Sequence, residues 1–181
     1  MEGKGITMDL LQVLLKRRSV RTYKEEPIKE EQLKKILSAG LLSPTGRNKK
    51  SWEFVVVEDR QDLIKMAKSR MAGAGMLEGA AAAIVVLGDE EKTDVWSEDC
   101  SIAMSNMHLM AASLGIGSCW IQGRLRTASE DVSTENYLRE KLGFPEHMRL
   151  EAILSLGIPY KEIQPHTLDE ADESKIHWGK Y

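Results

Sequence analysis

Cysteine is scarce in this chain and forms no pattern. The two cysteines, Cys100 and Cys119, are too few for a disulfide framework and lack the spacing of a metal site. We therefore expect two buried thiols in a reducing compartment. Histidine is also sparse, and its scattered positions predict no metal site: His108, His147, His166 and His177.

Long apolar runs and a strong charge of either sign are lacking too. Residues 1–6 contain no apolar signal region, and no run is long enough to span a membrane. A net charge of −3 argues against a nucleic-acid partner, which would need a clearly basic face. We predict a cytoplasmic protein that binds neither nucleic acid nor membrane, with residues 1–181 as one domain.

What the chain contains is a succession of helix and strand patterns. Residues 80–88 form an uninterrupted apolar run, which predicts a central strand buried on both faces. Residues 94–115 are apolar nearly all round, which predicts a helix buried in the core or in a dimer interface, with His108 as a satisfied histidine there. Apolar periodicity predicts the remaining elements, with helices at 8–17, 27–43, 59–70 and 135–142 and strands at 52–58, within 115–123 and at 150–158.

The final segment, residues 160–181, is polar and acidic before it turns mixed and aromatic around Trp178. A tail this poor in apolar residues is not expected to fold on itself. We expect it to lie along another surface, such as that of a partner subunit.

Three arginines fall within five residues directly after the first predicted helix: Arg17, Arg18 and Arg21. The helix dipole favours cations at a helix C-terminus, which accounts for the first two but not for Arg21. Guanidinium forks suit a phosphate or a delocalised ring anion, and Ser19 adds a hydroxyl. The local sequence leaves two interpretations open, an anion site and a set of surface salt bridges.

A polar loop, residues 44–51, precedes the strand predicted at 52–58. Pro44 and Gly46 restrict the loop to a shape that can present backbone amides to a ligand. Taken alone, the same residues also suit a plain connector between a helix and a strand.

These two segments resemble motifs of the nitroreductase family of flavin enzymes. Residues 17–21, Arg-Arg-Ser-Val-Arg, resemble the family's Arg-Arg-Ser-x-Arg. Residues 43–54 resemble its Ala-Pro-Ser-x-x-Asn-x-Gln-Pro-Trp-x-Phe, with Lys50 in place of Gln and Ser51 in place of Pro. Three further blocks follow in order: a Gly-x-Gly turn into a strand at 115–123, Leu-Gly-x-Pro at 156–159, and a tail at 175–181 like that of the shorter members.

The resemblance implies an α+β, three-layer fold with a mixed, mostly antiparallel central sheet flanked by helices. It implies an obligate homodimer with two FMN sites at the interface. The implied reaction is ping-pong: NADH or NADPH gives a hydride to the flavin N5, and the reduced flavin passes two electrons to a nitroaromatic, a quinone or a similar small aromatic acceptor. The flavin carries this chemistry, so no general acid or base is expected.

The resemblance also implies roles for individual residues. Arg17, Arg18 and Ser19 would bind the FMN phosphate and ribityl chain, and Lys175 would complete the phosphate clamp. Arg21 would lie near the N1 and C2 carbonyl edge of the ring, where a cation stabilises the anionic reduced flavin.

The ring itself would be contacted from two sides. The partner subunit would supply Pro44, Thr45 and Asn48. The other edge would be lined by residues of the strand within 115–123, with a backbone amide near N5: Trp120, Ile121, Gln122 and Gly123.

Other readings remain open. The same scaffold can support a specialised flavin reaction, such as reductive dehalogenation or flavin fragmentation, or a non-catalytic flavin-binding dimer. A purely structural dimer would bind no flavin at all. The region 69–82 is short, so any lid over the site would be small.

Overall fold

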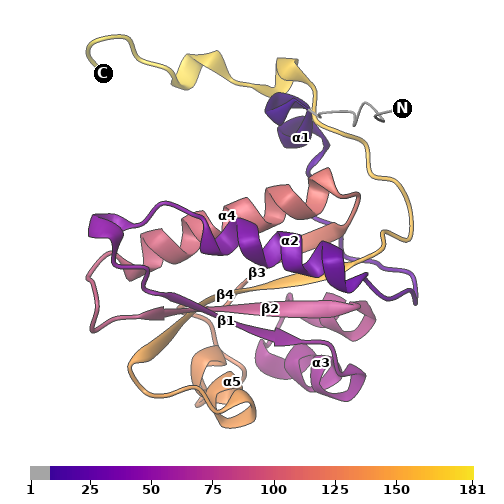
Figure 1. The fold of residues 1–181 in the computed structure, drawn as a ribbon, viewed down its shortest axis with the longest axis vertical. Helices are drawn as coiled ribbons and strands as arrows, with labels where there is room; N and C mark the ends of the chain where they lie inside the picture. The colour runs from indigo at the N-terminus through magenta and orange to yellow at the C-terminus, as the bar shows by residue number, and fades with distance from the viewer. Residues whose placement is uncertain (1–8) are drawn as a thin grey trace.

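A computed structural model describes residues 9–181 of the protein. These residues form a sheet of four strands between two layers of helices, with α2 and α4 on one face and α3 and α5 on the other (Figure 1). The predicted three-layer α+β architecture is confirmed. The strands are β1 (Trp52–Val57), β2 (Ala82–Asp89), β3 (Gly117–Gln122) and β4 (Met148–Gly157), and the helices are α1 (Leu10–Lys16), α2 (Glu30–Leu41), α3 (Arg60–Met66), α4 (Trp96–Ser113) and α5 (Thr134–Leu142).

The strand order is β1-β2-β4-β3, and all three strand pairs are antiparallel. The prediction of a mixed sheet is therefore wrong for residues 9–181. A parallel element exists only as an isolated bridge between Ser19 and Ser118 at the outer edge of β3. The segment around Ser19 follows that edge too briefly to form a fifth strand.

The centre of the sheet is the apolar run that the sequence places there. Every residue of β2 is buried, as predicted, because β1 and β4 flank it and helices cover both faces. Burying a Leu, Ile or Met side chain contributes about 1.5–3 kcal/mol. The fully buried residues of β2 and β4 are thus the main source of stability available to this fold.

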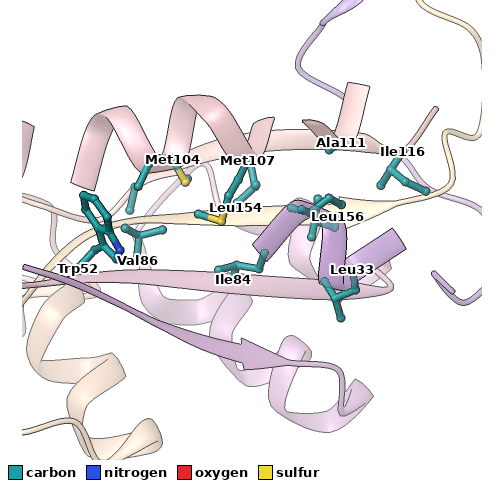
Figure 2. Packing of buried hydrophobic residues seen from close by; sticks show 14 of the residues in the cluster. Leu33, Trp52, Ile84, Val86, Met104, Met107, Ala111, Ile116, Leu154 and Leu156 are labelled. Atoms are coloured by element: carbon teal, nitrogen blue, oxygen red, sulfur yellow. The ribbon is translucent and has the colours of Figure 1, made fainter. Parts of the chain in front are cut away.

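Helix α4 packs across this sheet with its long apolar face. Met104 and Met107 point down towards Ile84 and Leu154 of the two central strands (Figure 2). The helix starts and ends two residues inside the range predicted from the sequence. Helix α2 covers the rest of the same face, with Leu33 turned inward.

The first turn of α4 approaches β2 closely because Gly88 has no side chain. A Cβ atom built on Gly88 would lie 2.5 Å from the Trp96 ring and 2.9 Å from the Cys100 sulfur. The Cys100 thiol also donates to the Leu87 carbonyl oxygen at 3.4 Å. The position of α4 on the sheet therefore depends on this glycine.

Helix α1 and the C-terminal tail lie together outside the three layers (Figure 1). The His166 amide donates to the Leu15 carbonyl oxygen at 2.8 Å. Both segments expose apolar groups, with Leu10 62% and Trp178 90% accessible. Among the helices formed by residues 9–181, none has the length and apolar character needed to cross a membrane.

We predict that Gly88→Ala lowers the free energy of unfolding by about 1–3 kcal/mol, because the added methyl group overpacks the contact with Trp96. Urea unfolding followed by circular dichroism measures this. Gly79→Ala is the matched control, since no atom lies within 4 Å of a Cβ there. Equal stability of the two variants would contradict the packing argument.

Candidate functional site

The arginine segment lies along the free edge of β3. Because β3 is the last strand of the sheet, only its β4 side is fully paired. The Val20 amide donates to the Ser118 carbonyl oxygen at 2.9 Å, and Ser19 forms the parallel bridge to the same residue. Two segments that the sequence predicts to share a site, 17–21 and 120–123, are thus brought together at one edge.

Beyond Ser118 the edge of β3 stays open. Backbone groups of a strand alternate in direction with a period of two residues, so the amides of Trp120 and Gln122 point outward like the Ser118 carbonyl. The Gly123 amide points the other way and donates to the Glu151 carbonyl oxygen at 3.2 Å. No loop or helix within 9–181 bonds to the two outward amides. They are available donors next to the arginine segment.

The polar side chains at this edge form hydrogen bonds within the segment 120–124. The Trp120 indole Nε1 donates to Gln122 Oε1 at 2.9 Å, and Gln122 Nε2 donates to the Arg124 carbonyl oxygen at 3.3 Å. Ile121 points to the opposite face of the sheet and is buried in its core. Of the four residues predicted here, Ile121 therefore contributes packing rather than an exposed side chain.

The three guanidiniums have no carboxylate partner among residues 9–181. Arg17 contacts the His108 ring at 3.0 Å, Arg18 donates to the Gln164 carbonyl oxygen, and Arg21 donates to the Ser19 carbonyl oxygen at 3.4 Å. Every recorded partner is a neutral group. Within this part of the chain the three arginines therefore form no surface salt bridges. Their positive charge remains available to an anion.

A hollow of about 370 Å³ opens beside this cluster, between the segment 16–20, the loop before β3 and the start of the tail. Lys16, Arg18 and Lys161 place three cations on its wall, against the single carboxylate of Glu162. Its charge is the same sign as that of the arginine segment it adjoins.

His108 is the residue of this region that sequence reasoning did not assign to the site. It is buried, as predicted, with 8% of its surface exposed, and both ring nitrogens have partners. Nε2 lies 3.0 Å from Arg17 Nη1, and Nδ1 lies 2.5 Å from Ser118 Oγ. A guanidinium can only donate, so Nε2 accepts and Nδ1 carries the proton that is donated to Ser118. Burial, with help from the Arg17 charge, lowers the His108 pKa to about 4.

The polar loop before β1 is fixed by the buried carboxylate of Asp99. Thr45 Oγ1 donates to Asp99 Oδ2 at 2.7 Å, and the Gly46 amide donates to Oδ1 at 2.8 Å. Three non-glycine residues of this loop have left-handed backbone angles: Arg47 (φ 51°), Asn48 (φ 55°) and Lys50 (φ 47°). Such backbone is costly and persists where surrounding contacts impose it, which is common at functional sites.

Within one chain this loop is far from the arginine segment. Asp99 lies in the first turn of α4 and His108 nine residues later, a separation of about 13 Å along the helix axis. Figure 1 shows the loop after α2 and helix α1 at opposite ends of α4. The structure thus separates Pro44, Thr45 and Asn48 from residues 17–21 of the same chain.

Lys175 is also separate from the arginines. Its side chain is 81% exposed in the tail, with Asp172 Oδ2 3.7 Å away. The tail reaches the arginine segment at Gln164, whose carbonyl oxygen accepts from Arg18, and not at Lys175. Within one chain Lys175 does not complete the predicted clamp.

An antiparallel sheet between two helical layers, with arginines at its free edge that form no salt bridge within residues 9–181, defines an α+β protein with a candidate anion site. Comparison with known proteins identifies the family to which this fold belongs. The sequence model described as the nitroreductase family matches residues 14–75 and 68–158. The chain belongs to the nitroreductase family.

Individual relatives match this chain along nearly its whole length. A protein of Archaeoglobus fulgidus, provisionally named an NADH dehydrogenase/NAD(P)H nitroreductase, is 37% identical over 96% of this chain and 99% of its own. The structure of an FMN-dependent nitroreductase from Clostridium difficile R20291 superposes with a TM-score of 0.92 at 40% identity, covering 94% of this chain and 99% of that one. A Bacteroides fragilis nitroreductase solved with bound FMN gives a TM-score of 0.73 at 27% identity, covering 94% and 98%.

We predict that acid destabilises the protein partly through His108. In the unfolded chain its pKa lies near 6.5, whereas in the folded protein it is about 4. Between these values the unfolded state binds a proton that the folded state does not. The free energy of unfolding therefore falls as the pH drops from 6.5 towards 4, by on the order of 1–3 kcal/mol.

Urea unfolding of the wild type and of His108→Gln at pH 7 and pH 4.5 measures this contribution. The variant should lose less stability than the wild type over the same interval, because glutamine does not titrate. Identical pH dependence in the two proteins would rule His108 out as a source of acid sensitivity.

Proposed function

We propose that this protein is an FMN-dependent oxidoreductase that passes two electrons from NADH or NADPH to a nitroaromatic, a quinone or a similar acceptor. The observation that carries the proposal is the set of unneutralised guanidiniums beside an open strand edge, in a chain of the nitroreductase family. The FMN named for the Clostridium difficile and Bacteroides fragilis proteins supports the cofactor assignment. The names of the curated relatives support the nicotinamide donor.

The hydrogen-bond donors of the arginine segment suit the phosphate of FMN. A phosphate carries close to two negative charges and accepts several hydrogen bonds, and arginine is the residue that meets it with two parallel donors. Arg17 and Arg18 each use one recorded bond to a neutral group, which leaves most of their donors free. Ser19 lies between them on the edge of β3.

The open edge of β3 suits the ring. Outward amides at Trp120 and Gln122 are rigid donors, because β4 fixes the strand that carries them. Arg21 is exposed and makes a single long bond within its own segment, so its charge is available to the electron-rich edge of a ring. When bound, FMN supplies the redox chemistry, in which NAD(P)H and a proton reduce a quinone to its hydroquinone, or a nitro group to the nitroso group and water, leaving NAD(P)⁺. The residues of this chain bind the cofactor and orient it.

We infer further that the working form is a homodimer. Helix α1 and the end of α2 expose a run of leucines, with Leu42 84% accessible, beside a groove of about 430 Å³ that contains Leu10 and Leu109. An apolar surface of this kind marks an interface. A second chain would also bring its loop 44–48 to the arginine segment, which the first chain's own loop does not reach. The exposed aromatic tail, residues 160–181, would pack on the same partner.

We predict that the protein loaded with FMN loses its visible flavin absorbance under anaerobic conditions when NADH or NADPH is added. Reoxidation by menadione or nitrofurazone then reports the acceptor class. Bound flavin that neither nucleotide reduces would favour the non-catalytic or specialised flavin readings. Failure to bind FMN would refute the proposal and leave a shared fold only.

A second prediction concerns the dimer. Leu42→Glu should dissociate the subunits and weaken FMN binding at least tenfold, because the charge is buried in the proposed interface. Met71→Glu is the control, as Met71 is also exposed but follows residues 67–69, which contact α3 and α5 on the opposite face of the sheet. Sedimentation velocity and flavin titration at several protein concentrations test both variants. A dimeric, fully flavinated Leu42→Glu protein would place the interface elsewhere.

A further inference from the structure

Arg17, His108 and Ser118 form a hydrogen-bonded chain built from three separate elements. Arg17 follows α1, His108 belongs to α4, and Ser118 belongs to β3. The contacts are 3.0 Å between Arg17 Nη1 and His108 Nε2, and 2.5 Å between His108 Nδ1 and Ser118 Oγ. The histidine and the serine are both buried, and the arginine is half-buried.

We propose that His108 is a positioning residue that aims the Arg17 guanidinium at the phosphate group of the flavin cofactor. The inference rests on the proposed function, since it takes FMN as the ligand. It assigns a role in binding to a residue that does not itself contact the ligand. His108 acts through Arg17 alone.

The imidazole of His108 is immobile. Helix α4 holds its backbone, and both ring nitrogens are engaged, so the ring has no free rotation. Ser118 is in turn fixed by the ladder to β4 and by the Val20 amide on its other side. One of the five donors of Arg17 is thereby bound to a fixed point, which restricts where the rest of its fork can reach.

The support that His108 gives to Arg17 is electrically neutral. A carboxylate in this place would hold Arg17 equally well, but it would cancel the charge that a phosphate needs. A neutral imidazole accepts from the guanidinium and leaves its full positive charge available. The other titratable groups facing the cluster do not alter this, because Arg21 is a cation and burial raises the pKa of the Cys119 thiol, which keeps it neutral.

The effect of His108 on flavin affinity should be confined to binding of the phosphate group. Riboflavin has the same ring and ribityl chain as FMN but no phosphate. A residue that only positions the phosphate-binding guanidinium changes the affinity for FMN and leaves that for riboflavin unchanged. A residue that supports the fold of the site changes both.

The experiment compares dissociation constants for FMN and riboflavin, measured at pH 7.5 by quenching of flavin fluorescence on titration with the flavin-free protein. His108→Leu removes both hydrogen bonds at similar volume and should weaken FMN binding about tenfold, as for one lost charge-assisted bond. Riboflavin binding should stay the same. His108→Gln supplies a neutral acceptor and donor and should restore FMN binding close to that of the wild type.

Two further variants keep the test decisive. Ser118→Ala frees only the far side of the imidazole and should weaken FMN binding selectively by about threefold, even where His108→Leu fails to fold. Met104→Leu, buried one turn earlier on α4, is the control for disturbance of the helix and should change neither constant. Equal losses of FMN and riboflavin, or no FMN loss in either test variant, would overturn the positioning role alone. A wild-type protein that binds neither flavin would overturn the proposed function with it.

Discussion

The pairing of a short polar segment with the last strand of the sheet is the constraint on which the candidate site depends. The bond from the Val20 amide to Ser118 holds the backbone that carries the three arginines against the open edge of β3. The edge matters as much as the segment, because only a terminal strand keeps outward amides unpaired. Such an edge is normally a liability, and here the neighbouring cations make it a place for an anionic ligand.

Much of the fold could be read from the sequence, and for identifiable reasons. The uninterrupted apolar run 80–88 suits a strand buried on both faces, and β2 is such a strand. The length of α4 followed from its apolar surface. The mixed sheet that the resemblance implied was not found. Within residues 9–181 the only parallel pairing is the isolated bridge between Ser19 and Ser118.

The grouping of the candidate site residues was predictable by segment and not by contact. Motifs located 17–21 and 120–123, whereas His108 looked like an ordinary core histidine because its partner Arg17 is 91 residues away. Strand order and the pairing register with β4 together decide that the amides of Trp120 and Gln122 face outward, and no local pattern encodes either. The role of Asp99 in fixing the loop 45–51 was hidden for the same reason, as it acts across 54 residues.

Helix α4 carries two supports, Asp99 in its first turn and His108 in its C-terminal half. Each added or removed residue between them would rotate one support by about 100° relative to the other and shift it by 1.5 Å. Neither a carboxylate holding a strained loop nor an imidazole holding an arginine tolerates that rotation. The spacing of nine residues between the two supports is therefore fixed by the geometry of the helix, whatever else changes along the chain.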